Sequence, residues 1–212
     1  MVAHTKISVV YQSNSGNTRR IAEALKDGAQ SVKDTEVHLL EIVGSDVREG
    51  RWSNDSILET LDASDAIAFG CATYMGSASA VFKTFLEKAF DKWAGQTWKD
   101  KFATGFTNSA SPSGDKLSTL LQLSVFAAQM GMIWVGVADG PGGILSTSTP
   151  DSINRIGSWI GVMGQSNIDQ PPQLAPASGD LITARRLGER LSEVTQRWHG
   201  RGSYQTTRVK LL

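Results

Sequence analysis

The stretch Val9–Leu25, "VVYQSNSGNTRRIAEAL", passes from an apolar run through a polar loop into a helical pattern without a break. The residues up to Tyr11 read as a buried strand, and apolar residues from Ile21 onward recur at the helical period. Between them, residues 13–18 are small and polar and include Gly16. A plain turn needs only one or two such residues, so this strand-to-helix junction indicates a binding loop.

The composition is typical of one α/β domain of ordinary size. The chain has 212 residues, of which 40% are hydrophobic, which is enough to bury a full core. Its 21 basic residues balance 21 acidic ones, which argues against nucleic acid as the main partner, because phosphate binding needs a clustered basic surface. A single cysteine, Cys71, excludes an internal disulfide, no paired Cys or His spacing indicates a metal site, and no apolar run is long enough for a membrane span. We expect one domain over 1–200, a flexible tail over 201–212 and a cytoplasmic location.

Strand-like and helix-like segments alternate along the chain. Apolar runs read as strands at 6–11, 35–42, 66–70, 102–109 and 132–137. Helical patterns are centred on 21–32, 57–61, 82–90, 116–130 (with Asp115 as the capping residue) and the residues from about 179 to 198. Segments 44–54 and 138–178 read as loops. This alternation builds right-handed βαβ units, so the sequence predicts an α/β fold with a five-stranded parallel sheet, doubly wound, with helices on both faces.

In such sheets ligands bind outside the carboxyl ends of the strands, where the strand order reverses. The loop at 13–18 lies at such an end and opens a helix, whose free N–H groups and partial positive charge suit a phosphate. Ser13, Ser15 and Thr18 add hydroxyl donors, and Gly16 allows close approach of the backbone. No lysine is present, and neither the triphosphate-binding nor the dinucleotide-binding glycine motif occurs, so we expect a terminal monophosphate. The alternative is a loop that only turns the chain and caps the helix.

Two further loops follow the third and fourth predicted strands. They are "GCATYMGSASA" at 70–80 and "TNSASPSGDK" at 107–116. All three loops are expected to meet over one crevice, because the carboxyl ends of parallel strands share one edge. A flat aromatic ligand would be held there by backbone groups and packed by Tyr74 and Met75.

These segments carry a resemblance to a known family. "SNSGNT" at 13–18 is similar to the phosphate loop of flavodoxins. The segments "GCATYMGSASAVFKTFLEKAFDKW", "GFTNSASPSGDKLSTLLQL" and "QMGMIWVGV" resemble the tryptophan-repressor-binding protein A family of FMN-dependent NAD(P)H:quinone oxidoreductases, over about 6–137. The resemblance implies a flavodoxin-like sheet of order 2-1-3-4-5, FMN as cofactor, NAD(P)H as co-substrate, and two-electron transfer to a quinone or similar small acceptor.

The resemblance also assigns residues to the site. It implies that the FMN phosphate is bound by Ser13, Ser15, Gly16, Asn17 and Thr18, the isoalloxazine edge by Thr73, Tyr74, Met75, Gly76 and Ser77, and the remaining flavin contacts by Asn108, Ser109, Ala110, Ser111 and Gly114. It implies a homo-oligomer, a dimer or tetramer, in which Trp93 reaches the flavin of a neighbouring subunit. Where the family often has paired histidines the chain has Gln129 and Met130, and Pro112 removes one backbone donor from the third loop. No side chain need act as catalytic acid or base, since the flavin carries the chemistry.

Three functions remain open from the sequence. The first is the FMN-dependent oxidoreductase. The second is a flavodoxin-type electron carrier, although carriers usually present a strongly acidic face and this chain is neutral. The third is a flavodoxin-like binding protein that has lost FMN, since a fold does not fix a function.

Overall fold

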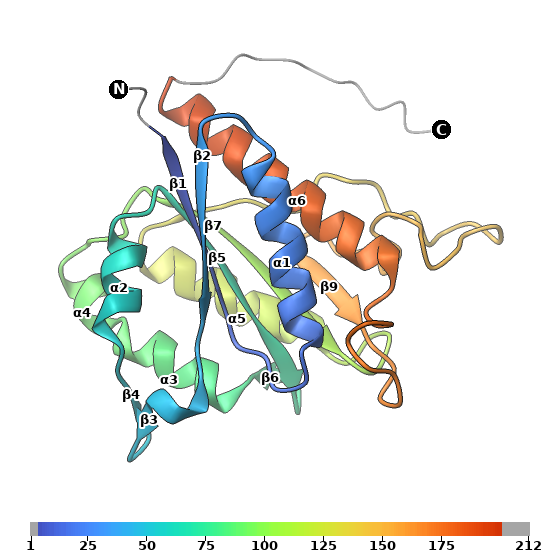
Figure 1. Cartoon of the computed structure of the whole chain (residues 1–212), viewed down its shortest axis with the longest axis horizontal. Coiled ribbons are helices and arrows are strands. Elements are labelled where there is room, and N and C mark those ends of the chain that lie inside the picture. Colours follow the sequence, from blue (N-terminus) through green and yellow to red (C-terminus); the bar gives the residue numbers. More distant parts are fainter. Residues whose placement is uncertain (1–3, 201–212) are drawn as a thin grey trace.

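A computed structural model describes residues 4–200, and a parallel sheet forms its centre (Figure 1). The strands lie in the order β2-β1-β5-β7-β8, and every neighbouring pair is parallel. In that order they span Thr35–Glu41, Thr5–Tyr11, Ala66–Tyr74, Phe102–Ser109 and Ile133–Trp134. Because β5, β7 and β8 are the third, fourth and fifth predicted strands, the flavodoxin-like 2-1-3-4-5 order is confirmed.

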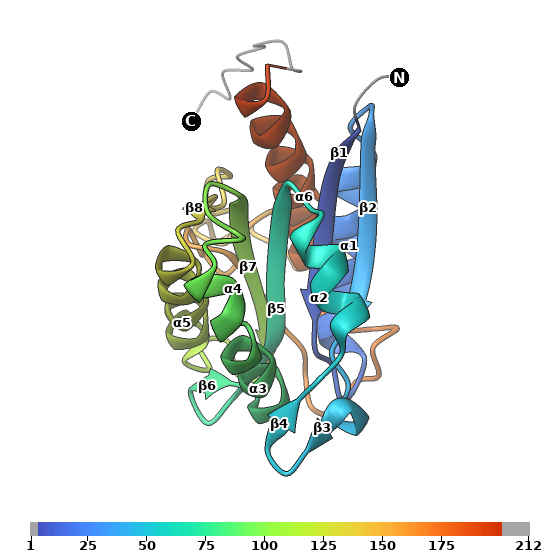
Figure 2. The same cartoon turned by 90° about the vertical axis from the view of Figure 1, so that its left-hand side faces the viewer.

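Helices cover both faces of the sheet (Figures 1 and 2). One face carries α1 (Asn17–Gln30) and α6 (Ser178–Trp198), and the other carries α2 (Asp55–Asp62), α3 (Ala80–Lys88), α4 (Phe90–Ala94) and α5 (Lys116–Gln129). Each helical layer buries its own apolar cluster against the strands, around Leu25 and Leu187 in the first layer and around Phe85 and Leu123 in the second. Burial on both sides explains why β5 is apolar from Ala66 to Gly70 without a polar break.

Helices α1 and α6 touch through their backbones. A methyl group placed on Gly28 would lie 1.8 Å from the backbone oxygen of Arg185, and one on Gly188 would lie 2.0 Å from that of Leu25. Only glycine allows so close an approach. Since α1 begins at the first loop, its contact with α6 fixes the position of that loop.

The fifth strand is divided into two pieces. β8 pairs with the beginning of β7, while β9 (Val162–Gln165) pairs with the end of β7, from Phe106 to Ser109. Between them the chain leaves the sheet: the Val137 amide bonds the oxygen of Trp159 (2.9 Å) rather than β7. The predicted strand at 132–137 is therefore too long, and the predicted loop at 138–178 contains a strand.

Other predicted boundaries also change. The third strand continues past residue 70 to Tyr74, and the predicted helix at 82–90 is divided between α3 and α4. Segment 44–54 is not a plain loop: it contains a short 3-10 turn (Gly44–Asp46) and the hairpin β3–β4 (Val47–Arg48 and Arg51–Trp52), which buries Trp52. The predicted tail at 201–212 lies outside the described residues.

The expectation that Asp115 caps α5 is wrong. Asp115 has a left-handed φ of 51°, and its side chain makes no capping hydrogen bond. A capping side chain normally projects from an extended backbone, which Asp115 does not have.

Neither a membrane-spanning helix nor a metal-binding cluster occurs between residues 4 and 200. No helix in that range combines the length and apolar character needed to cross a bilayer. No three His, Cys, Asp or Glu side chains converge there in a way that could hold a metal ion.

Candidate functional site

The three predicted loops meet at the carboxyl edge of the sheet. The Asn14 side-chain amide donates to the Tyr74 hydroxyl (3.3 Å), which joins the first loop to the second. A Cβ atom on Gly76 would lie 3.8 Å from the Cβ of Asp115, so the second loop also touches the third. One crevice is thus bordered by segments that are far apart in the sequence.

The first loop is shaped by Ser13. Its Oγ accepts hydrogen bonds from the backbone N–H groups of Gly16 (3.1 Å) and Arg19 (3.3 Å). Gly16 has a φ of +88°, which side chains rarely adopt and which lets the chain turn into α1. Ser13 therefore supports the loop from within.

The N–H groups at the start of α1 are left free. The Arg20 N–H makes the first helical bond, to the Gly16 oxygen (3.1 Å). Within residues 4–200, the N–H groups of Ser15, Asn17 and Thr18 have no acceptor. The first turn of α1 carries no acidic residue, so nothing offsets its partial positive charge. This arrangement suits a phosphate group.

Gln12 adds a polar atom that the sequence analysis missed. Its side-chain amide donates to Asn14 Oδ1 (2.7 Å), while its Oε1 is buried without a partner in the described part of the chain. A buried acceptor without a donor is costly, so a ligand hydroxyl is the kind of group expected beside it. FMN fits this test, because its ribityl chain carries hydroxyls next to its phosphate. Gln12 reads in the sequence as the end of a strand and gives no signal of this role.

The second loop is a tight hairpin between β5 and β6 (Ser77–Ala78). Both residues at its tip, Met75 and Gly76, have positive φ values, 49° and 74°. Tyr74 is 46% exposed and the Met75 side chain is fully exposed. The hairpin thus presents an aromatic and an apolar side chain to the surface.

The two hydroxyls of this loop are engaged inside the protein. Thr73 is buried, and its Oγ1 bonds the Oγ1 atoms of Thr107 and Thr119, both at 2.8 Å. The Ser77 hydroxyl donates to Gln122 Oε1 (3.1 Å). These hydroxyls therefore hold the hairpin on β7 and α5, and the backbone of the loop is left to meet a ligand.

The third loop rests on Lys116, which the sequence analysis read as an ordinary first residue of a helix. The Lys116 side chain is fully buried, and its ammonium donates to Ser109 Oγ (3.0 Å), the Ser111 oxygen (2.6 Å) and the Pro112 oxygen (3.0 Å). Burial lowers the pKa of Lys116 from 10.5 to about 8. Gly114 has a φ of +54°, and a Cβ there would lie 2.1 Å from Ser109 Oγ. The loop is therefore closely packed on its lysine.

The end of β9 supports the third loop from the other side. The Gln165 side chain donates to the Ala110 oxygen (2.8 Å), and the Ser166 hydroxyl donates to Oδ1 of the buried Asn108 (3.0 Å). Gln165 is itself held, because its N–H donates to the carboxylate of Asp180 (2.9 Å).

That carboxylate belongs to a buried ion pair. Asp180 also accepts from the Arg155 guanidinium (2.8 Å), and it is 2% exposed. Burial raises the pKa of Asp180. The pair joins the segment between β8 and β9, which contains Arg155, to the first turn of α6.

A fourth segment, which follows β9, covers the first loop. The Asn17 side chain donates to the Ala175 oxygen (3.0 Å), and a Cβ on Gly16 would lie 3.0 Å from the Pro172 ring. This segment lies within 138–178 and has neither periodicity nor a motif, so the sequence leaves open whether it covers the site or forms an interface.

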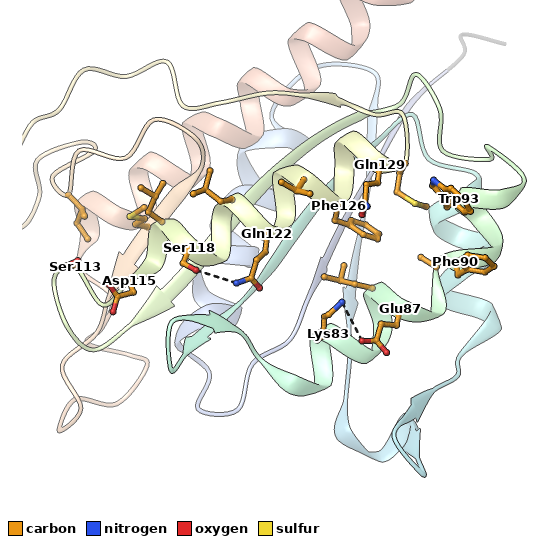
Figure 3. A pocket seen from close by; sticks show the side chains of 18 of the residues that line it. Lys83, Glu87, Phe90, Trp93, Ser113, Asp115, Ser118, Gln122, Phe126 and Gln129 are labelled. Atoms are coloured by element: carbon orange, nitrogen blue, oxygen red, sulfur yellow. Dashed lines mark hydrogen bonds and ion pairs between the residues drawn. The ribbon is translucent and has the colours of Figure 1, made fainter.

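Trp93 and Gln129 lie away from these loops. They border one end of an open groove of about 1840 Å³, whose other end is bordered by Ser113 and Asp115 of the third loop (Figure 3). The 14 residues of α5 separate the two ends, about 20 Å along the helix axis. Exposed apolar side chains line the groove between them: Leu117, Leu121 and Val125. Trp93 and Gln129 are thus near each other but far from the crevice of their own chain.

Comparisons with known proteins agree with this architecture. The sequence model of a family described as NADPH-dependent FMN reductase matches residues 5–139. A Pseudomonas aeruginosa protein named flavodoxin FldP is 37% identical over 92% of this chain and 99% of its own length. An Archaeoglobus fulgidus protein named NAD(P)H dehydrogenase (quinone) is 26% identical over 91% of this chain and 98% of its own. The solved structure of a flavodoxin, WrbA-like protein from Agrobacterium tumefaciens has a TM-score of 0.69 at 37% identity, and the match covers 91% of this chain and 98% of that one.

Proposed function

The chain belongs to the NADPH-dependent FMN reductase family, among its flavodoxin-like, WrbA-type members, and from this we propose that it passes two electrons from NAD(P)H through FMN to a quinone or similar small acceptor. Membership makes it an FMN-dependent oxidoreductase; the acceptor is the proposal. The observation that carries the cofactor assignment is the first loop, with its free N–H groups and the orphaned Gln12 acceptor beside them.

The proposed binding roles follow the geometry of each loop. The phosphate is bound by the N–H groups at the start of α1, together with the first-loop residues Ser13, Ser15, Gly16, Asn17 and Thr18. The flavin ring lies between the hairpin, with Thr73, Tyr74, Met75, Gly76 and Ser77, and the third loop, with Asn108, Ser109, Ala110, Ser111 and Gly114. Bound FMN supplies the electron transfer chemistry, and these residues bind it, orient it and exclude water around it.

We also propose that a second copy completes the site. Trp93 and Gln129 lie far from the crevice of their own chain, so they can meet a flavin only if copies associate. The apolar row on α5 supports this, because α5 carries no charged side chain after Lys116 and yet exposes Leu117 (52%), Leu121 (46%) and Val125 (58%). Replacing Leu121 by Asp should give a monomer in sedimentation experiments and lower turnover with little loss of FMN. An unchanged sedimentation coefficient would argue against this face.

The first test is the visible spectrum of the purified protein after incubation with FMN and removal of the excess. A retained flavin spectrum that is bleached by NAD(P)H and restored by benzoquinone is the expected result. If no flavin is retained, the first loop is a helix cap only, and a binding protein without FMN becomes the better account.

The phosphate assignment has a matched pair of variants. Ser15→Ala combined with Thr18→Ala should weaken FMN by about 1 to 3 kcal/mol, the usual cost of removing hydrogen bonds to a charged group. Ser56→Ala combined with Thr60→Ala removes the same groups from another helix, α2, and should leave FMN affinity unchanged. Equal affinity in both double variants would exclude the assignment.

An electron carrier is the second candidate, because the relative that is 37% identical is named flavodoxin. A carrier should be bleached by dithionite but not by NAD(P)H. The same spectrum therefore separates the two functions.

A further inference from the structure

Lys116 occupies a position that local electrostatics disfavours. It is the first residue of α5, at the positive end of the helix dipole, and its side chain is fully buried. Burying an ammonium costs free energy even when it is hydrogen-bonded. When a natural protein keeps a residue against its local preference, the position is usually a functional site. The contacts of Lys116 therefore indicate its role.

Lys116 determines which way the backbone carbonyl groups of the third loop point. Five consecutive carbonyl groups, from Ser109 to Ser113, accept hydrogen bonds from inside the protein. The Lys116 ammonium binds the oxygens of Ser111 and Pro112, and the Lys116 N–H binds that of Ser113 (3.2 Å). The other two are bound by the Ser166 N–H (3.1 Å, to Ser109) and the Gln165 side chain (2.8 Å, to Ala110).

The N–H groups of this loop consequently face the other way. In a trans peptide the C=O and the following N–H point in opposite directions. The N–H groups of Ser111, Ser113 and Gly114 follow the bound carbonyls of Ala110, Pro112 and Ser113 and so point away from the groups that bind those oxygens. None of the three finds an acceptor among the described residues. The third loop is thus lined with free donors, although Pro112 contributes none.

We propose that Lys116 is a positioning residue of the FMN site: it keeps these three N–H groups turned toward the flavin and places a positive charge behind them, which favours reduced FMN. The proposal rests on the function proposed above. A hydride from NAD(P)H carries two electrons and one proton, so the neutral ring gains a negative charge when NAD(P)⁺ leaves. Free N–H groups backed by a cation stabilise such a charge.

Within residues 4–200, no other cation donates to the carbonyl groups of the third loop. Gln129 is uncharged and lies at the far end of α5. The charged groups around Lys116 are Asp180 of α6, Arg155 between β8 and β9, and Asp115, which directly precedes Lys116 in the sequence. Arg155 and Asp180 are paired with each other, which leaves the Lys116 charge to act on the loop.

A second lysine provides the matched control. Lys101 likewise donates to three backbone oxygens, those of Leu61 (3.3 Å), Asp62 (2.5 Å) and Ser64 (2.5 Å), but it directly precedes β7 at the opposite edge of the sheet. Lys116→Met and Lys101→Met remove the same group from the two edges. For each variant and the wild type, the affinity for oxidised FMN is measured by fluorescence quenching and the midpoint potential of bound FMN by equilibration with a reference dye.

Lys116→Met should weaken oxidised FMN about tenfold and reduced FMN about a hundredfold. The additional factor of ten corresponds to a fall of about 30 mV in the midpoint potential of this two-electron couple. Lys101→Met should lower the melting temperature and change neither FMN quantity. A folded Lys116→Met protein with an unchanged midpoint potential overturns the proposal, because a lysine with a merely structural role would weaken both forms of FMN equally.

If Lys116→Met does not fold, Lys116→Gln takes its place. Glutamine keeps two donors for the loop but has no charge, so the midpoint potential should still fall, and an unchanged value again overturns the proposal. A wild-type protein that retains no FMN would instead refute the proposed function, and the two failures are therefore distinct.

Discussion

Lys101 and Lys116 make the same kind of contact at opposite ends of the strands of one sheet. Lys101 lies at the amino end of β7, and Lys116 supports the loop that follows its carboxyl end. Lys101 binds oxygens at the carboxyl end of α2, where a cation agrees with the helix dipole. Lys116 binds oxygens next to the amino end of α5, where a cation opposes the dipole. One lysine, which is partly buried, thus binds the oxygens of a helix end, whereas we propose that the other, which is fully buried, opposes the helix dipole because it positions a loop.

The two lysines also differ in whether the polar groups around them are paired. Beside Lys101, the Asp62 carboxylate accepts from both Lys92 (2.6 Å) and the Trp98 indole (2.7 Å), so the polar groups there satisfy one another. Beside Lys116, backbone donors are left free. At the amino ends of the strands the polar groups are paired and contribute to stability, whereas at the carboxyl ends backbone donors remain available to bind a ligand.

The largest effect on FMN affinity should come from a substitution that distorts the third loop. Gly114→Ala places a methyl group against Ser109 Oγ and requires a left-handed alanine. That conformation alone costs about 1 to 2 kcal/mol. Because the clash also pushes Ser109 away from Lys116, we expect FMN affinity to fall by at least about a hundredfold, or roughly 2.7 kcal/mol.

Gly50→Ala is the control for this prediction. Gly50 has a φ of +73°, but a Cβ there meets nothing within 4 Å. It should cost stability through backbone strain alone and leave FMN affinity unchanged. Similar FMN losses in both variants would mean that strain anywhere, and not the third loop, weakens the site.

Removing Lys101 should have the next largest effect, on stability alone. Lys101→Met leaves three carbonyl oxygens without their donor, and we expect about 2 kcal/mol less stability in urea unfolding, since hydrogen bonds from charged groups are stronger than neutral ones. FMN affinity should match that of the wild type once both proteins are folded. A loss of FMN affinity would show that the two edges are coupled.

Raising the pH should change stability and FMN affinity in opposite directions at Lys116. Burial lowers the pKa of Lys116 to about 8, so the folded, FMN-free protein releases this proton near pH 8, whereas the unfolded chain keeps it until about pH 10.5. Between these values the unfolded state binds more protons, and the contribution of Lys116 to stability rises with pH. Affinity for FMN should do the opposite, because the neutral amine has lost a donor and its charge.

We expect FMN affinity to fall up to about tenfold, or about 1.4 kcal/mol, between pH 7 and pH 9. The second pKa of the FMN phosphate is about 6, so the phosphate is already mostly the dianion at pH 7 and contributes little to the change. Titrations of the wild type and of Lys116→Met measure the difference, and the variant should show no such fall. The same slope in both proteins would assign the pH dependence to another group.

The smallest effect should come from the exposed link between the first and second loops. Tyr74→Phe removes the hydroxyl that accepts from Asn14 at 3.3 Å. An exposed hydrogen bond of this length should contribute about 0.5 kcal/mol, or a twofold change in FMN affinity. A loss of tenfold or more in the same titration would show that the hydroxyl binds the ligand directly.

The sequence predicted the sheet well where burial decides the pattern. β1 and β7 are buried along nearly their whole length, and their predicted and observed ranges agree closely. β9 escaped prediction because "VMGQ" is short and has no alternation, and it becomes a strand only by completing the edge of β7. The same holds for the hairpin β3–β4, whose stability comes from the burial of Trp52.

The sequence predicted the location of the candidate site better than the contacts within it. The three loops were identified because parallel strands bring their carboxyl ends together. The direction of the Thr73 hydroxyl was not visible, because it depends on β5 extending beyond Gly70. The burial of Lys116 was also hidden, since a lysine at a helix start reads as a surface residue. Both roles are created by contacts with residues distant in the sequence.

The division of the fifth strand has a consequence for the order in which the protein can assemble during synthesis. A ribosome completes β7 and α5 well before it reaches β9 and α6, so the last half of β7 has no partner on its outer side until Val162–Gln165 has emerged. The supports of the third loop at Gln165 and Ser166, and the cover of the first loop by Pro172 and Ala175, arrive just as late. The cofactor crevice therefore forms only after the segment up to Ala175 has been synthesised, and a chain interrupted before β9 would expose an unpaired strand edge in place of a binding site.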